Sequence, residues 1–355
     1  MRLASFVVKR LVLTTLTLLV LSLTIFYTAS FFPAEQRALL FVSPQSYHHP
    51  GYDPWSRLPQ IAAKYHLYDA FYVQYLNWLG VLFTERTLGY SYYYGGGIVE
   101  AILNSFPPTL ELVMYSAPII ILGGIKLGVY SAKREHEKRK RDDPADIIIR
   151  LATTLAYSMP IFFTGLLMIS VFFLNLHWFA PGRIGRDAQM FISSRTWRSY
   201  TGLYTIDGIL NGQFWIFIDA LKHLVLPVAT LTISMIPIIV KVTRSSMLIE
   251  FSQPYVTMIR AKGLREVEVL SRVKRNAMIS ILTVTSIIFA NMLTGIVVTE
   301  NIFSLGGVGS LAVGAAKNYD FTLLVGLSIF FCLIFVTVNL IVDVAYTYID
   351  PRVKL

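Results

Sequence analysis

Cysteine and charged residues are both scarce in this chain of 355 residues. The single cysteine, Cys332, excludes an intramolecular disulfide and any metal cluster built on cysteine ligands. Charged residues make up 15% of the chain and hydrophobic residues 55%, whereas soluble domains have about 25% and 45–50%. So few charged side chains cannot coat a water-soluble core of this size. The composition excludes an ordinary soluble enzyme, a disordered chain and a nucleic-acid-binding domain, and it indicates a membrane protein.

Catalytic motifs are also missing. There is no GxxxxGK[ST] loop that could hold the phosphates of ATP. His136-Glu137 begins a zinc-protease pattern, but Lys140 stands where the second histidine is needed. Gly89-Tyr90-Ser91 resembles a serine nucleophile turn without a paired base, and Tyr92–Gly97 has the composition of a flexible loop. We therefore expect a non-enzymatic chain that has no catalytic, cofactor-binding or metal-binding residue of its own.

Six apolar segments are long enough to cross about 30 Å of hydrocarbon as helices of roughly 20 residues. The predicted fold class is an all-α integral membrane protein with one transmembrane domain, 1–355. The first segment exceeds the apolar core of a signal peptide, so we expect an uncleaved helix. The expected spans are 11–32, 107–131, 151–175, 223–243, 277–299 and 321–343, with a large loop 33–106 after the first and a loop 246–276 between the fourth and fifth.

Lysine and arginine are distributed unevenly between the two sides of these spans. Twenty lie in the N-terminal segment, in 133–150, in 241–275 and in the C-terminal tail, against five in the opposite short loops. Cytoplasmic loops carry the excess of Lys and Arg. We therefore predict that both termini and loop 246–276 are cytoplasmic and that loop 33–106 is external. The net charge of +10 has the same explanation, so no nucleic-acid partner is expected.

The loop 246–276 has the pattern of two short amphipathic helices separated by Gly263. Val267, Leu270 and Val273 recur at three-residue spacing, with charged residues on the remaining faces. Such a segment can lie on lipid headgroups, or it can bind a soluble cytoplasmic partner. The residues alone do not decide between these two interpretations.

The run Pro254–Leu264 (PYVTMIRAKGL) resembles the coupling loop of permease subunits in the dipeptide/oligopeptide group of binding-protein-dependent ABC importers. Thr257, Met258 and Ile259 replace the usual Glu-Ala-Ala, and Ser280 replaces a proline. The resemblance covers nearly the whole chain. It includes Lys9–Leu11, Tyr75–Leu79, Leu88–Ser91, Pro108–Leu112, His223–Pro227, Arg275–Ile279, Glu300–Phe303, Gly307–Gly309 and Asp350–Arg352.

This resemblance implies a multi-pass subunit of the cell (plasma or inner) membrane that forms half of a translocation pathway. It implies four kinds of partner: a second homologous permease, two ATP-binding subunits that hold ATP and Mg²⁺, an extracytoplasmic substrate-binding protein and the lipid bilayer. The coupling residues would be Tyr255, Arg260, Ala261, Lys262, Gly263, Leu264 and Leu270.

The cargo implied by the resemblance is a peptide, and oligosaccharides are the alternative. External aromatic residues could stack on sugar rings or cover a docking surface; they are Tyr47, Tyr52, Trp55, Tyr65, Tyr68, Tyr72 and Trp78. A stand-alone secondary carrier or channel is the alternative from another class. That class would show inverted repeats or polar clusters at the midplane, and neither is clear in the sequence.

Overall fold

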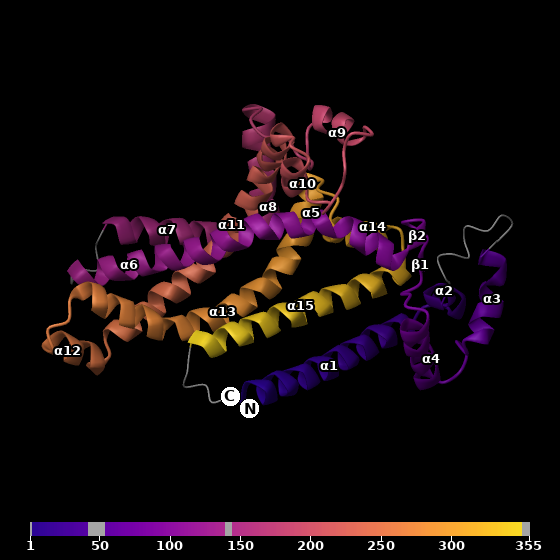
Figure 1. Ribbon diagram of the computed structural model, residues 1–355, viewed down its shortest axis with the longest axis horizontal. Coiled ribbons are helices and arrows are strands. Elements are labelled where there is room, and N and C mark those ends of the chain that lie inside the picture. The colour runs from indigo at the N-terminus through magenta and orange to yellow at the C-terminus, as the bar shows by residue number, and fades with distance from the viewer. Residues whose placement is uncertain (1, 42–53, 139–143, 350–355) are drawn as a thin grey trace. The chain divides into compact units, whose positions relative to one another are not determined.

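The computed structural model describes residues 2–41, 54–138 and 144–349. The chain divides into two compact units, and Figure 1 labels the helices and strands. Unit 1 comprises Met1–Thr109 and Gly306–Thr337, and unit 2 comprises Leu110–Leu305 and Val338–Leu355. Tyr47, Tyr52 and the Asp350-Pro351-Arg352 stretch lie outside the described residues, as does the side chain of Trp55.

Unit 1 contains much regular structure in the part of loop 33–106 that the structure describes. Arg37 of α2 is only 8% exposed, and its guanidinium donates to the carbonyls of Phe32 and Leu67 at 3.0 and 3.1 Å and to the side chain of Gln74. The elements of this unit are α1 (Arg2–Ala29), α2 (Ala34–Ala38), the 3-10 turn η1 (Leu39–Phe41), α3 (Pro54–Lys64), α4 (Phe71–Thr84), β1 (Tyr90–Ser91), β2 (Gly96–Gly97), the first part of α5 (Ile98–Pro118), α14 (Val308–Lys317) and most of α15 (Phe321–Ile349).

The segment Tyr92–Gly97, expected as a flexible loop, is instead the turn of a buried hairpin. Tyr90 pairs with Gly97 and Ser91 with Gly96 in antiparallel register. Ser91 is fully buried and donates from Oγ to the carboxylate of Asp320 at 2.6 Å, and the Tyr93 amide donates to the same oxygen. Ser91 therefore serves as a structural hydrogen-bond donor.

Unit 2 is built around α11, which packs closely against α6. A Cβ at Gly124 would lie 2.7 Å from Ile239, and one at Gly128 would lie 2.5 Å from Thr243, so this Gly-x-x-x-Gly face brings two backbones together. The elements are the rest of α5, the π-helical turn η3 (Ile119–Gly123), α6 (Gly124–Lys138), α7 (Pro144–Ser158), α8 (Ile161–Met168), the π-helical turn η4 (Ile169–Asn175), α9 (Arg186–Ile192), α10 (Tyr204–Leu210), α11 (Phe214–Phe251), α12 (Pro254–Ala261) and α13 (Glu266–Phe303).

The segment before α11 is held in place by two buried carboxylates. Glu111 is 3% exposed; it accepts from Thr205 N and Oγ at 2.8 and 2.7 Å and pairs with Arg183 at 3.1 Å. Asp207 is fully buried and accepts from the amides of Thr201 and Gly202 at 2.9 and 3.0 Å. These contacts order α10 and the turn before it.

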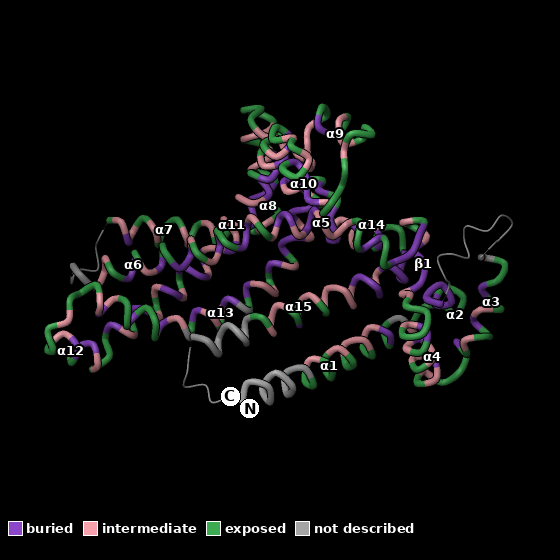
Figure 2. The backbone as a smooth tube through the Cα atoms, viewed as in Figure 1, coloured by how far each residue is buried: buried purple, intermediate pink, exposed green. Residues whose placement is uncertain are grey.

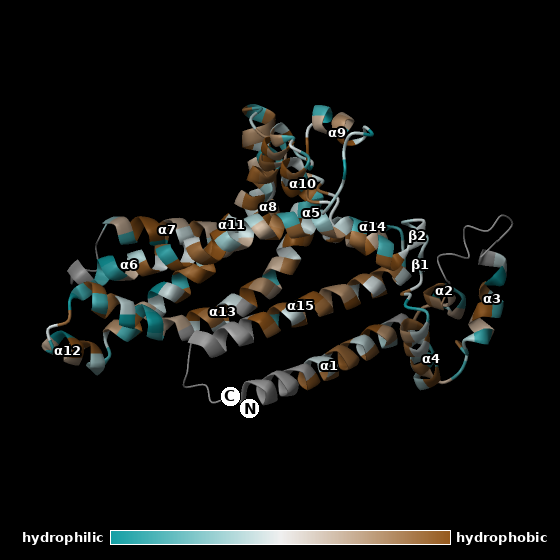
Figure 3. Ribbon diagram, viewed as in Figure 1, coloured by the Kyte–Doolittle hydropathy of each residue, from teal (hydrophilic) through white to brown (hydrophobic). Residues whose placement is uncertain are grey.

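Four helices in the described residues are long and apolar enough to cross a membrane, namely Ile98–His136, Phe214–Phe251, Ser280–Phe303 and Phe321–Ile341. The first of these starts nine residues earlier than the expected 107–131, and the others contain or lie close to the expected spans 223–243, 277–299 and 321–343. α1 covers most of 11–32 and is 28 residues long. Figure 3 shows hydrophobic residues along α1 and α15. A count of six spans, with both termini cytoplasmic, stays a prediction.

The expected third span, 151–175, is not one straight helix. α7 ends at Ser158, α8 begins at Ile161, and the two are bent by 101°. Pro160 caps α8 with φ −58° and ψ 140°. A proline disfavours helical geometry in the residue before it and cannot donate an amide hydrogen bond. An uncharged run was predicted as one span, although its proline marks the break.

Candidate functional site

The candidate site is the turn between α12 and α13, at one end of unit 2 (Figure 1). Pro254 lies in the first turn of α12, where a missing amide costs nothing. At the other end Gly263 has φ +77°, its amide donates to Arg260 O at 2.9 Å, and the Leu264 amide donates to Ile259 O at 3.3 Å. These two bonds form a Schellman motif, in which glycine is the favoured left-handed residue. The prediction that Gly263 separates two helices is confirmed.

The helix after the turn differs from the prediction. α13 runs without interruption from Glu266 to Phe303, 38 residues, so the second short helix and the fifth span are one element. Its start is stabilised by Glu268, which accepts from the Arg265 amide at 2.9 Å. Glu266 and Glu268 also place negative charge in the first turn, as the helix dipole favours.

The inner face of α12 is fixed on the hydrophobic core of unit 2. Val256 and Ile259 are 1% and 4% exposed, and Tyr255 and Leu264 pack against the same core. The Tyr255 hydroxyl donates to Glu250 at 2.9 Å. Burial and this bond to a carboxylate raise the pKa of Tyr255 to about 12. Tyr255 therefore stays protonated, and its hydrogen bond joins α12 to the end of α11.

Arg260 connects α12 with two other helices. Its guanidinium binds Glu266 through two bonds, of 2.9 and 3.0 Å, and donates to His136 Nε2 at 2.9 Å. The His136 ring stacks on Phe251 with centroids 4.2 Å apart and planes 6° apart. The bond to Arg260 is the largest cause of the lowered pKa of Glu266. His136, rejected as a zinc ligand, is thus part of the support of this turn.

The exposed surface of the turn divides the seven predicted coupling residues into two groups. Ala261, Lys262 and Gly263 are exposed, whereas Tyr255, Arg260, Leu264 and Leu270 are partly buried against unit 2 (Figure 2). Sequence reasoning missed two exposed apolar side chains, Met258 at 52% and Val267 at 76%. We define the outer face of the turn as the exposed residues Thr257, Met258, Ala261, Lys262 and Val267.

The face assigned to α13 from the three-residue spacing needs correction. Val267 points to solvent, while Val269, Val273 and Ala277 are at most 2% exposed. Leu270 packs beside them. The buried stripe follows the i, i+4, i+8 positions of a helix instead of i, i+3, i+6. The four-residue spacing of Val269, Val273 and Ala277 was the sequence pattern that could have identified the buried face of α13.

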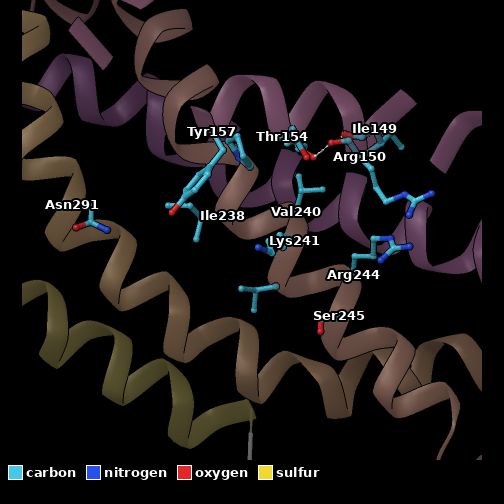
Figure 4. Close-up of a pocket in the computed structure, with 13 residues that line it drawn as sticks. Ile149, Arg150, Thr154, Tyr157, Ile238, Val240, Lys241, Arg244, Ser245 and Asn291 are labelled. Carbon is cyan, nitrogen blue, oxygen red and sulfur yellow. Dashed lines mark hydrogen bonds between the residues drawn. The ribbon is translucent and has the colours of Figure 1, made fainter. Parts of the chain in front are cut away.

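A cavity of about 780 Å³ lies between α7, α11 and α13 (Figure 4). This volume is within the usual range of ligand pockets, about 300–1,000 Å³. Its walls combine apolar and polar residues. It is lined by Ile149, Arg150, Thr153, Thr154, Tyr157, Pro237, Ile238, Val240, Lys241, Val242, Arg244, Ser245 and Asn291.

A buried carboxylate fixes one side of this cavity. Asp146 of α7 is 1% exposed and binds Arg244 Nε and Arg150 Nε at 3.0 Å each. Ser131 of α6 also donates to Asp146, and Arg244 pairs with Glu135. One network therefore joins α6, α7 and α11. No group of three or more His, Cys, Asp or Glu side chains suited to a metal ion occurs among the residues described.

Known proteins resemble this chain over most of its length. Residues 124–355 match the family described as binding-protein-dependent transport system inner membrane component. The oligopeptide transport system permease protein AppB of Bacillus subtilis (strain 168) is 33% identical over 297 residues, covering 83% of this chain and 84% of that protein. The probable D,D-dipeptide transport system permease protein DdpB of Escherichia coli (strain K12) is 33% identical and covers 79% and 80%. The di/tripeptide transport system permease protein DppB of Pseudomonas aeruginosa (strain UCBPP-PA14) is 33% identical and covers 80% and 81%.

Proposed function

The chain belongs to the family of inner membrane components of binding-protein-dependent transport systems, and from this premise we propose that it is the permease subunit of an ATP-driven peptide importer. The observation that carries the proposal is the similarity to permeases named for oligopeptide, D,D-dipeptide and di/tripeptide transport, along about four fifths of both chains. In such a machine this chain forms half of the pathway, beside a second homologous permease. An external binding protein supplies the peptide.

The α12–α13 turn is the proposed docking site for the ATP-binding subunit. Two features support this assignment. The outer face presents apolar Met258 and Val267 to solvent beside the cation Lys262, a combination suited to a protein surface. The inner face is held rigidly through Tyr255 and through the Arg260–Glu266–His136 contacts. A rigid turn can transmit the motion of a docked partner to α11 and α13.

The cavity lined by α7, α11 and α13 is the proposed contribution of this chain to the pathway. Tyr157 and Asn291 supply hydrogen-bonding groups and Lys241 supplies positive charge, whereas Arg150 and Arg244 are paired with Asp146. The lining therefore suits a peptide's carbonyl groups and carboxylate. Aromatic stacking on sugars has less support. Trp78 is 2% exposed and Tyr65 stacks on Phe41 with centroids 4.6 Å apart, so both rings are used for packing.

Reconstitution of the whole transporter tests this proposal. Vesicles that contain this chain, its homologous permease, both ATP-binding subunits and the binding protein should accumulate labelled di- to oligopeptides only when ATP is supplied on the side of the ATP-binding subunits. The isolated chain should neither bind nor hydrolyse ATP, because it has no phosphate-binding loop. Accumulation of peptide by the isolated chain would favour a secondary carrier, and uptake of oligosaccharides in place of peptides would overturn the proposed cargo.

A further inference from the structure

The helix α4 in unit 1 carries no charge on either face, and its exposed face is largely apolar. Its 14 residues, Phe71–Thr84, contain no charged side chain. Gln74, Trp78 and Val81 form the buried face. The opposite face exposes three large side chains, Tyr72 at 66%, Leu76 at 62% and Phe83 at 76%. A helix that faces water normally carries charged or polar residues on that side, whereas these three exposed side chains are aromatic or aliphatic.

Contacts with α1 place α4 beside the apolar part of that helix. Phe26 of α1 is 1% exposed, and its ring centroid lies 5.4 Å from Trp78 and 5.6 Å from Tyr75. The Tyr75 hydroxyl also lies 2.8 Å from Ser22 Oγ. At 1.5 Å per residue, Phe26 is about 5 Å and Ser22 about 10 Å before the end of α1 at Ala29. α4 therefore packs on the apolar segment of α1 instead of beyond its end.

The exposed surfaces of the two helices are continuous. On α1, Leu16, Val20 and Leu23 are 58%, 56% and 41% exposed, as expected of side chains that face lipid. Tyr27 continues this surface, and its ring contacts Phe71 at 5.4 Å. Figure 2 shows exposed residues along α1 and α4, and Figure 1 shows α4 beside the C-terminal part of α1.

We propose that α4 is an interfacial helix that lies in the outer leaflet, with Tyr72, Leu76 and Phe83 inserted among the lipids. The proposal rests on the membrane-spanning assignment of α1 made above. Interfacial helices insert an apolar face about 5–10 Å into the boundary between headgroups and acyl chains, which is the depth given by Phe26 and Ser22. Tyr72 adds an aromatic ring of the kind enriched at that level.

This insertion would anchor the external part of unit 1. Arg37 ties α2 to the segment after α3 through the Leu67 carbonyl and to α4 through the Gln74 side chain. Because α4 is bonded to these elements, holding α4 in the bilayer fixes their orientation against the membrane plane. The anchoring surface is distinct from the cavity and from the outer face of the α12–α13 turn.

Fluorescence quenching in the assembled transporter tests this assignment. In a Cys332→Ala background, single cysteines replace Leu76 on α4, Leu16 on α1 or Gln60 on α3, which are all exposed. Each variant is labelled with a bimane probe and placed in nanodiscs of phosphatidylcholine and phosphatidylglycerol. Quenching is measured with nitroxide-labelled acyl chains and, separately, with iodide. For an inserted face, the Leu76 probe should be quenched by the lipid nitroxide at least about threefold more than the Gln60 probe, with the reverse order for iodide.

The Leu16 probe separates the two possible failures. If it is not quenched by lipid, the span assignment of α1 is wrong and the proposed topology fails. If Leu16 is quenched by lipid but Leu76 is quenched by iodide like Gln60, the interfacial helix alone is refuted. Protection of Leu76 from both quenchers also refutes it, because the face is then covered by protein.

Discussion

A substitution at Gly263 can distinguish the loss of docking from the loss of stability that backbone strain causes. Its φ of +77° is left-handed, and no atom other than those of the adjacent residues lies within 4 Å of the position that a Cβ would take. A side chain there meets no clash, so the folding cost of Gly263→Asp is the left-handed penalty, about 1–2 kcal/mol. In a docked and desolvated contact the same carboxylate is an unpaired charge, which costs about 3–5 kcal/mol.

Gly212 supplies a matched control. It has φ +68°, has open space around its Cβ position, and its amide donates to Ile209 O at 3.0 Å, three residues back as at Gly263. Gly212→Asp therefore carries the same backbone penalty in the turn before α11, away from the outer face. The two variants should lose similar thermal stability. Only Gly263→Asp should weaken binding of the ATP-binding subunit, by about two to four orders of magnitude for a loss of 3–5 kcal/mol.

The assay is retention of the ATP-binding subunits on purified permease in detergent, with a parallel thermal unfolding curve. Equal retention by Gly263→Asp and Gly212→Asp at matched stability would refute the docking assignment. Loss of retention in both variants would show that strain alone is responsible. A lipid-lying turn predicts that retention survives in both.

Three further predictions concern unit 2. Asp146→Asn should destabilise the protein by about 1–3 kcal/mol, because it removes the charged partner of Arg150 and one of the two carboxylates that pair with Arg244. Asp187→Asn, at an exposed position of α9, should have little effect in the same unfolding assay. Glu266→Gln should lower the free energy of unfolding by about 0.2–1 kcal/mol at neutral pH. Since the pKa of Glu266 in the folded protein is lowered from 4.5, this stability difference from wild type should be complete above pH 4.5 and disappear as the pH falls through the lowered pKa. A stability difference that stays constant with pH would contradict the role of the carboxylate. In the Cys332→Ala background, cysteines at Ser193 and Arg272 should react with an impermeant maleimide from opposite sides, and labelling of both from outside would overturn the predicted topology.

Local rules explain which parts of the candidate site were predictable. Pro254 at a helix start and Gly263 at a helix end follow stereochemical preferences that depend on a few neighbouring residues, so the helix–turn–helix was correctly placed. The buried face of α13 was misassigned because Val267, Leu270 and Val273 satisfy an apolar spacing as well as Val269 and Val273 do. Only tertiary packing decides between two overlapping stripes. The Arg260–His136 contact joins residues 124 positions apart, which no local pattern indicates.

The larger differences between the predicted and the observed helices arose where apolar composition was used alone, without the prolines and helix boundaries inside each segment. Pro160 inside an uncharged run broke the third span. The uncharged helix Phe71–Thr84 was missed because the whole range 33–106 was treated as loop. At Ser280, where the resemblance implies a proline, α13 continues as a helix without a break.

The continuity of α13 defines the mechanical path on which the proposed coupling depends. A 38-residue helix is about 57 Å long, and its two ends carry different contacts. At one end Glu266 is bonded to Arg260 of α12; at the other, Phe303 O accepts from the Gly182 amide at 2.7 Å. With no proline or loop between them, α13 can carry a displacement of α12 to its far end as a tilt of the whole helix. The close α6–α11 contact at Gly124 and Gly128 and the Asp146 network hold the neighbouring helices together. We therefore expect motion at the turn to change the cavity between α7, α11 and α13, because Asn291 on its wall belongs to the moving helix.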